Sequence, residues 1–374
     1  MKEALKKFSV NCEPEMKLLL ACISIDTSHD SKNLINAISQ RKLHWEKFLG
    51  LCQYHEVLGI VYLRLVSGFK DYVPEFILIE LKYEHENNCK KCLLISASLI
   101  GLVGTLRKNT IRAVCYKGPV LSYINHKDIS VRQYCDIDFL VEEKDVELIR
   151  KVMIQLGFEE ERKIKGWKRN LYQWFECENN FFKVDTGPWV EIHHKILPRL
   201  LVIKDSNEIW LKETEWIVFV GSKIEVPRQE NSLLILCLHG SKHLWCKLKW
   251  SADLYHFLKS HPGLDWSYIE VTSKHLGIER LISIGLNVVR HLYDLELTGR
   301  AMTIASRADD MYAIETCVAD SIDDTSNGKR TSNKFVRRQV FNFFVHKNFI
   351  DKVTYLMWSL PARAIYCLVR VVLR

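Results

Sequence analysis

The chain has 374 residues, of which 48% are hydrophobic and 26% are charged, and its formal net charge is +8. This composition excludes a disordered or fibrous chain, and the length predicts two or three globular domains. The mild positive charge fits either an ordinary solvated surface or a phosphate-bearing partner. Because the basic residues are scattered and no RNA-binding motif is present, we expect no nucleic-acid partner.

The twelve cysteines predict reduced thiols. One C-x-x-C pair, Cys89 and Cys92, is present, but no second pair accompanies it to frame a zinc site. The first residues lack the apolar segment of a signal peptide, so we expect a cytoplasmic protein. The apolar run at residues 16–25 is much shorter than the ~20 residues that span a bilayer, and we expect no transmembrane segment.

Residues 1–108 are predicted to be an N-terminal helical region. An apolar helix begins at residues 16–23, and apolar residues recur at steps of three and four between Trp45 and Leu58. Residues 77–108 predict one long helix, with a candidate break near Gly101 or Gly104. These apolar stripes indicate helix packing and no chemistry.

Residues 109–228 predict an α/β core. A short apolar strand at residues 111–116 ends at Lys117-Gly118-Pro119, and a helix follows from the proline. A strand, a glycine turn and a helix together form a phosphate-binding geometry, because free N–H groups at the helix start face an anion. Lys117 adds a positive charge there, although an ordinary turn has the same residues.

Residues 134–141 are β-branched, aromatic and apolar, apart from Asp136 and Asp138, and predict a buried strand. Side chains two residues apart share one face of a strand, so the two carboxylates project in the same direction. Two buried like charges require a neutralising cation. Oxygen ligands favour Mg²⁺ or Mn²⁺.

The rest of the core is predicted as a helix and several strands. In a later strand, residues 189–193, Glu191 and His193 share one face. The predicted class is therefore α+β, a small mixed β-sheet core flanked by N-terminal and C-terminal helical regions. The other predicted elements are a helix at residues 146–156, strands at 172–177 and 181–184, and a hairpin of residues 216–220 and 223–226 that turns at Gly221-Ser222.

Residues 229–374 are predicted to be a C-terminal helical region, with helices at 231–243, 248–258 and 281–293. His239 and His243 have the i, i+4 spacing of metal ligands. Gly240 replaces the acid of a metalloprotease, which favours packing or substrate contact over zinc. Trp245, Trp250 and Asp253 are candidates to line a cleft beside the acids.

Two stretches near the C-terminus have their own predictions. The polar run at residues 319–333 predicts a mobile loop. The apolar tail at 366–374 predicts a docked terminal helix, with membrane contact as the alternative.

Asp136, Asp138 and Glu191 beside a glycine turn indicate two-metal phosphoryl chemistry, in which two ions about 4 Å apart clamp the attacking and leaving oxygens. Lys117 and Arg132 are the cations available for a triphosphate.

These residues resemble a known superfamily. The turn at Lys117-Gly118-Pro119, Arg132, the Asp-x-Asp strand and the run Glu191-Ile192-His193 are similar to the polymerase-beta-like nucleotidyltransferases. More closely, the chain resembles the bacterial uncharacterised nucleotidyltransferase family that is found in peptide and polysaccharide biosynthesis clusters. The runs from His239 to Trp245 and from Lys249 to Leu254 add to this similarity, which covers most of the chain.

The resemblance implies roles for individual residues. Asp136 and Asp138 would bind both metals, and Glu191 would bind the catalytic ion, with Asp185 as the alternative third carboxylate. Gly118 would let the backbone approach the triphosphate, although this turn has proline where the superfamily usually has serine. The implied nucleotide-binding residues are Lys117, Gly118 and Arg132, and the candidate substrate-binding residues are His193, His239, His243, Trp245 and Asp253.

The resemblance also implies a reaction. A nucleoside monophosphate would pass from an NTP, with ATP as the expected donor, to a hydroxyl or phosphate of a small molecule, a peptide or a protein. Mg²⁺ or Mn²⁺ would be the cofactor, and a peptide or biosynthetic intermediate is the expected acceptor. The alternatives are kinase-like phosphoryl transfer at the same site and a catalytically inactive binding module.

Overall fold

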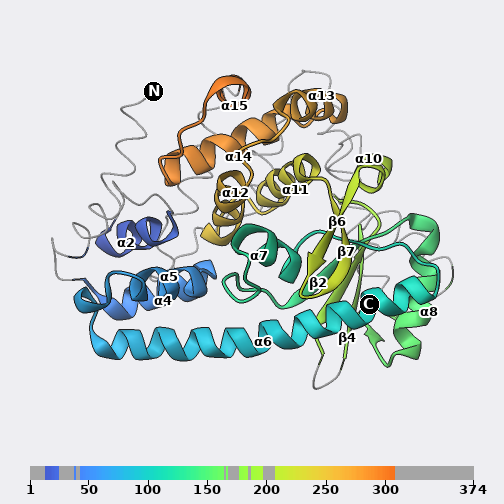
Figure 1. Cartoon of the computed structure of the whole chain (residues 1–374), viewed down its shortest axis with the longest axis horizontal. Coiled ribbons are helices and arrows are strands. Elements are labelled where there is room, and N and C mark those ends of the chain that lie inside the picture. The colour runs from blue at the N-terminus through green and yellow to red at the C-terminus, as the bar shows by residue number, and fades with distance from the viewer. Residues whose placement is uncertain are drawn as a thin grey trace.

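The computed structural model describes residues 13–24, 38, 43–163, 166, 177–183, 187–196 and 207–307. All contacts given below are between these residues. In Figure 1 the helices of the N-terminal region lie at the left, those of the C-terminal region lie across the top, and the sheet lies at the lower right. The long helix α6 (Glu75–Lys108) runs along the bottom, from the N-terminal helices to the sheet.

The N-terminal region is helical as predicted. Its elements are α2 (Pro14–Ile23), α4 (Trp45–His55), α5 (Leu58–Val66), the 3-10 turn η1 (Lys70–Tyr72) and α6 (Glu75–Lys108). Helix α6 continues through Gly101 and Gly104 without a break. A glycine inside a helix costs only about 1 kcal/mol. Both ends of α6 are anchored in hydrophobic clusters, Ile77 and Leu81 among the helices and Leu99 and Leu106 against the sheet, and this packing offsets that cost.

The sheet has five strands in the order β1-β2-β5-β4-β3. Strands β2 and β5 are parallel, and the other neighbours are antiparallel, so the sheet is mixed, as predicted. The strands are β1 (Val114–Cys115), β2 (Asp136–Leu140), β3 (Glu159–Glu160), β4 (Glu178–Phe182) and β5 (Trp189–His193). The predicted strand at 172–177 lies almost wholly outside the described residues, which resume at Cys177.

Three helices and a hairpin complete the core. Helix α7 (Gly118–His126) follows β1, η2 (Glu143–Asp145) leads into α8 (Val146–Gln155), and α10 (Asn207–Lys212) precedes the hairpin. The hairpin, β6 (Thr214–Phe219) and β7 (Ser222–Pro227), turns one residue earlier than expected. The turn residues are Val220 and Gly221, both with positive φ, because a two-residue turn of this kind matches the twist of the strands.

The C-terminal region contains the three predicted helices, α11 (Gln229–Lys242), α12 (Leu248–Ser260) and α14 (Glu279–Leu292). Two further helices, α13 (Trp266–Leu276) and α15 (Gly299–Ala305), had no strong sequence signal. The carboxylate of Asp265 caps α13 by accepting from the N–H groups of Ser267 and Tyr268. The predicted loop at 319–333 and the tail at 366–374 lie outside the described residues.

Two hydrophobic clusters hold the described chain together. In one, residues of the N-terminal helices such as Leu18 and Phe48 pack in the same cluster as Leu233 and Ile284 of the C-terminal helices. The other joins the sheet, through residues such as Phe139, to the second half of α6 and to α8. The N-terminal and C-terminal helices therefore share a core. The division of the chain at residues 108/109 and 228/229 stays a prediction.

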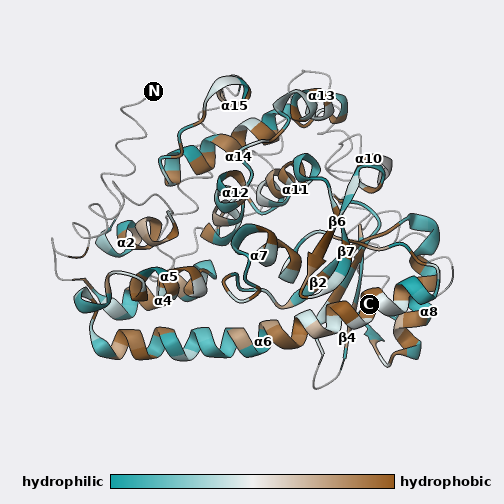
Figure 2. Ribbon diagram, in the orientation of Figure 1, coloured by the Kyte–Doolittle hydropathy of each residue, from teal (hydrophilic) through white to brown (hydrophobic). Residues whose placement is uncertain are grey.

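Helix α6 is, among the described helices, the one long and apolar enough to cross a membrane by length and composition. Its most apolar window is 33% buried inside the protein, and core helices of soluble proteins pass the same test, so this is weak evidence for a span. Apolar and polar residues alternate along α6 in Figure 2.

Candidate functional site

The acidic residues meet on the two central strands of the sheet. The parallel pairing of β2 with β5 places Asp138 directly beside Glu191, and Asp136 lies two residues before Asp138 on the same strand. Asp138 is only 3% exposed, whereas Asp136 and Glu191 are partly accessible. Burial and the neighbouring charge of Asp138 raise the pKa of Asp136 above its usual value. The three carboxylates therefore lie on neighbouring strands, as the sequence predicted.

His193 lies between two of these acids. Its Nε2 atom is 3.2 Å from Asp138 Oδ1 and 3.1 Å from Glu191 Oε2. The ligand atoms of Asp138, Glu191 and His193 all lie within 4.8 Å of one another. Burial of the ring lowers the pKa of His193, but hydrogen bonds to acidic neighbours, first among them Asp138, more than offset burial and raise the pKa well above its usual value. His193 is therefore an integral part of the acidic cluster.

Lys117 supplies the positive charge of the cluster. Its Nζ lies 2.6 Å from Asp138 Oδ1, and both side chains are buried. Burial alone would raise the pKa of Asp138, but the Lys117 ammonium and the hydrogen bond from His193 hold it well below its usual value. Lys117 is also the N-cap residue of α7, so the backbone N–H groups at the start of that helix lie beside the acids.

Gly118 is required by the close approach of its turn to β2. Its φ is +54°, and a Cβ atom built on it would lie 2.8 Å from the carbonyl oxygen of Asp136. A larger residue would meet both a strained backbone and a clash. The glycine turn predicted from the sequence thus lies directly against the Asp-x-Asp strand.

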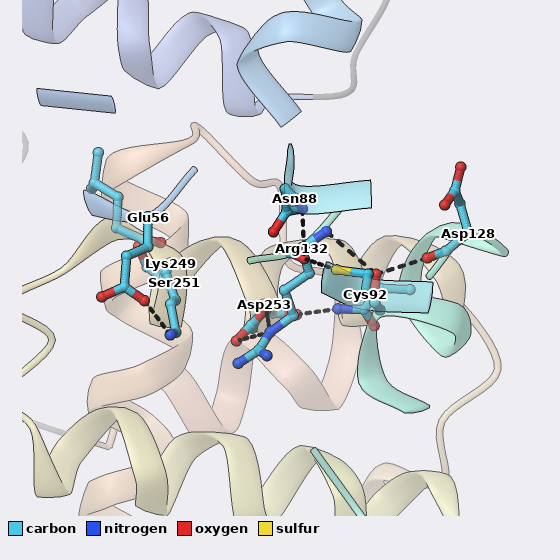
Figure 3. Close-up of polar contacts among 11 residues, drawn as sticks. Glu56, Asn88, Cys92, Asp128, Arg132, Lys249, Ser251 and Asp253 are labelled. Atoms are coloured by element: carbon cyan, nitrogen blue, oxygen red, sulfur yellow. Dashed lines mark hydrogen bonds and ion pairs between the residues drawn. The ribbon is translucent and has the colours of Figure 1, made fainter. Parts of the chain in front are cut away.

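Arg132 and Asp253, which the sequence assigned to nucleotide and substrate, bind each other (Figure 3). Arg132 Nε donates to Asp253 Oδ1 at 2.8 Å and to Oδ2 at 3.0 Å, and each side chain is 6% exposed. The backbone N–H of Arg132 donates to Ser122 Oγ at 3.3 Å. The side-chain amide of Asn88 donates to the Ser130 carbonyl at 2.7 Å. The ion pair joins the sheet-bearing core to α12.

A second polar contact joins the N-terminal and C-terminal helices. The Glu56 carboxylate pairs with Lys247 and Lys249 at the start of α12, and Figure 3 shows the Lys249 contact. These ion pairs join the end of α4 to the start of α12.

The aromatic residues of α11 and α12 form a cluster of their own. The His243 ring stacks on Trp250 with centroids 4.4 Å apart, and it meets His239 edge-on at 4.8 Å. Burial, followed by the charge of Lys117, lowers the pKa of His239 well below its usual value. The metal-ligand groups found among the described residues are formed by other side chains, and the role of the two histidines stays a prediction.

Trp245 is fully buried in the helical core. A Cβ atom on Gly240 would lie 2.4 Å from its ring, so the indole occupies the space that a side chain at position 240 would need. The absence of an acid between the two histidines therefore has a packing reason, and Trp245 packs in the helical core.

Glu178, the first residue of β4, and the preceding Cys177 also belong to the site, and sequence reasoning missed both. Glu178 is the cross-strand partner of His193, and its Oε2 lies 3.5 Å from His193 Nδ1 and 3.8 Å from Lys242 Nζ. Cys177 precedes the strand, and its thiol donates to Glu178 Oε2 at 3.7 Å. The sequence predicted strands at 172–177 and 181–184, whereas β4 covers Glu178–Phe182. Asp185, the alternative third carboxylate, lies outside the described residues.

Comparison with known proteins agrees with this geometry. The model of the uncharacterised nucleotidyltransferase family matches residues 41–294, more than half of the chain, from before α4 to the end of α14. Neither the curated proteins nor the solved structures contain a match. The matched region includes the glycine turn, both acidic strands and the histidines of α11. The chain therefore belongs to the uncharacterised nucleotidyltransferase family.

Proposed function

We propose that this protein is a metal-dependent nucleotidyltransferase, which moves a nucleoside monophosphate from an NTP, with ATP as the expected donor, to a hydroxyl or phosphate of an acceptor. The observation that carries the proposal is the register of β2 and β5. It sets Asp138 beside Glu191 on neighbouring strands, with Asp136 on the same strand as Asp138. Rigid strands are the supports that such carboxylates need, because metal geometry tolerates little movement.

The donor set fits Mg²⁺ or Mn²⁺. Carboxylate oxygens are the ligands that these ions prefer, and the ligand atoms of Asp138 and Glu191 lie within 4.8 Å of each other and of His193. Burial, followed by the neighbouring charge of Asp138, raises the pKa of Asp136, and a divalent ion beside the carboxylates would favour its ionised form. Bound ions would neutralise the phosphates and assist deprotonation of the acceptor.

The remaining residues hold the substrate and the proton. The ammonium of Lys117 and the N–H groups at the start of α7 face the position of a triphosphate beside β2. Gly118 lets the turn lie against β2, because a Cβ atom there would meet the Asp136 carbonyl oxygen at 2.8 Å, and the turn thereby brings the start of α7 beside the acids. His193 holds a proton between Asp138 and Glu191 and so fixes the direction of both carboxylates.

The acceptor in this proposal is a small molecule, a peptide or a protein. Within a biosynthetic pathway for a modified peptide or a surface polysaccharide, the nucleotidyl group would activate or mark an intermediate. The partly buried cluster of His239, His243 and Trp250 on α11 and α12 is the surface of stacked rings that such an acceptor, or the base of the NTP, would contact.

One observation favours a second candidate, a binding module without catalysis. Lys117 already neutralises Asp138 at 2.6 Å in a buried pair, and a carboxylate with a lysine partner has less need of a metal. In this candidate the acidic cluster is structural, and the helical surfaces bind a partner in a biosynthetic complex.

NTP turnover in the presence of Mg²⁺ separates these functions without knowledge of the acceptor. The full-length protein is incubated with ATP, and water or an added mixture of metabolites and peptides serves as acceptor. Formation of AMP and pyrophosphate, or of AMP-modified acceptor, supports nucleotidyl transfer if it requires the metal and is lost in Asp138→Asn. Formation of ADP and a phosphorylated acceptor would assign kinase-like transfer instead. If calorimetry finds no binding of ATP or Mg²⁺, the binding module is correct.

A further inference from the structure

The far side of His193 carries a second group of potential metal ligands. Its Nε2 faces Asp138 and Glu191, whereas its Nδ1 faces Cys177 and Glu178. The ligand atoms of Cys177, Glu178 and His193 lie within 4.8 Å of one another. This group contains sulfur, nitrogen and oxygen donors, a set that suits zinc and not magnesium.

The distances within the group match tetrahedral coordination. Zinc with bonds of about 2.0 to 2.3 Å holds its ligand atoms about 3.3 to 3.8 Å apart. Glu178 Oε2 is 3.5 Å from His193 Nδ1 and 3.7 Å from Cys177 Sγ. Two of the distances between ligand atoms therefore already suit tetrahedral coordination. Three protein ligands would leave the fourth position for water.

The backbone accounts for this convergence. Glu178 and His193 are directly opposed across the antiparallel pair β4 and β5, so their side chains share a face. Cys177 would point to the other face if the strand extended to it, but the chain bends there, and β4 begins at Glu178. The His194 N–H donates to the Cys177 carbonyl at 2.9 Å and holds the bend against β5.

A buried atom that lacks a hydrogen bond points into the group. His193 is 3% exposed, and its Nδ1 has no hydrogen bond of good geometry, although Nε2 has two acidic partners. Buried polar atoms without partners are rare in folded proteins and need an explanation. Once its Nδ1 proton has left, a histidine that donates Nε2–H to carboxylates presents an Nδ1 lone pair, and metal-binding histidines have this arrangement, in which a carboxylate orients the ring.

We propose that Cys177, Glu178 and His193 bind a zinc ion behind the acidic cluster. Binding displaces the protons of the Cys177 thiol and of His193 Nδ1, so two protons leave as one Zn²⁺ enters. The metal fixes His193 as a neutral ring that donates through Nε2 to Asp138 and Glu191. The ion thereby joins the start of β4 to β5 and sets the direction of two carboxylates. The inference is independent of the proposed nucleotidyl transfer, because it concerns binding and not turnover.

Cobalt provides the test, since Co²⁺ replaces Zn²⁺ in such sites and its bond to a thiolate gives a charge-transfer absorption band. The metal-stripped, full-length protein is titrated with Co²⁺ in excess Mg²⁺. We expect the band to saturate at one equivalent and to disappear when Zn²⁺ is added. Cys177→Ser should abolish the band and weaken Zn²⁺ binding, measured against a colorimetric chelator, by at least about tenfold.

Two matched variants complete the experiment. Cys89→Ser removes the thiol of another cysteine–histidine contact, in which Cys89 Sγ lies 3.5 Å from His85 Nε2. This variant should leave the band unchanged. Asp136→Asn perturbs the nucleotidyl-transfer site and should also leave it unchanged, so the two proposals fail separately. Circular dichroism confirms that each variant is folded. An absent band, a band that survives in Cys177→Ser, or one that disappears in Cys89→Ser would overturn the zinc site.

Discussion

Two buried ionic clusters in the described part of the chain differ in character. The pair of Arg132 and Asp253 has one charge of each sign and two hydrogen bonds between them. The site cluster brings Asp138 and Glu191 together around Lys117 and His193, with Asp136 and Glu178 beside them. Charges that balance are a structural link between elements, whereas an excess of acids in a partly buried place is the property of a site that receives cations.

Asp138→Asn is expected to lower NTP turnover at least about a thousandfold, or about 4 kcal/mol of transition-state stabilisation. The reason is that Asp138 is the carboxylate shared by Lys117, His193 and the proposed metals. Turnover is measured by product formation from ATP at saturating Mg²⁺. Asp71→Asn, an exposed acid in η1, is the matched control and should retain full turnover. Equal turnover in both variants would remove the site cluster from the chemistry.

Arg132→Met is expected to lower the free energy of unfolding by about 3 to 5 kcal/mol, because it leaves the buried Asp253 carboxylate without its partner. Denaturant unfolding measures the change. The double variant Arg132→Met/Asp253→Leu should recover most of the loss, since neither position then carries a charge. If the double variant is no more stable than the single one, the pair is not the isolated, balanced link that the geometry indicates.

Gly118→Ala is expected to cost about 2 kcal/mol of stability and to weaken ATP binding, because the new Cβ meets both a positive φ and the Asp136 carbonyl. Gly277→Ala is the matched control. Gly277 also has a positive φ, +70°, but a Cβ there would meet nothing within 4 Å. Denaturant unfolding and ATP titration of both variants separate backbone strain from the clash. An equal loss of stability, with ATP binding unchanged in both, would contradict the close approach of the turn to β2.

Asp136→Asn is expected to raise the free energy of unfolding by about 1 kcal/mol or less, although it should abolish turnover. Burial and Asp138 raise the folded pKa of Asp136, so its ionised form destabilises the folded protein at neutral pH. This penalty is present above the folded pKa and is relieved as the pH falls towards the ordinary value. The gain over the wild type should therefore shrink on acidification in unfolding measurements at several pH values. A variant that is less stable at neutral pH would contradict the excess of acid in the site cluster.

The arrangement of the acids on β2 and β5 could be predicted in part from the sequence. The alternation of strand side chains placed Asp136 with Asp138, and Glu191 with His193, on shared faces, and the structure has both arrangements. The glycine turn was recognised from residue types alone, because positive φ and close backbone approach demand glycine. The apolar residues spaced by three and four positions also predicted helices that the structure contains, such as α4, α6 and α14. Helices α13 and α15 were not found, because their polar and β-branched residues give a weak periodic signal.

What the sequence could not supply was the pairing of distant segments. Arg132 and Asp253 are 121 positions apart, and residue types alone predicted ligand contacts for both. The packing of α12 against the core instead makes them partners in an ion pair. Glu178 and Cys177 gave no signal, since their approach to His193 depends on the register of β4 with β5 and on a bend before β4.

By itself, the sequence determined the local features of this protein, namely its class, its apolar faces, its turn and the direction of each acid along its own strand. These depend on backbone geometry that repeats every two or 3.6 residues. Tertiary structure decided that β2 and β5 run parallel with Asp138 opposite Glu191, that His193 enters between them, and which cation meets which acid. Those outcomes are set by the packing of distant elements into shared cores, where the register of two strands or the seating of one helix fixes every contact at once.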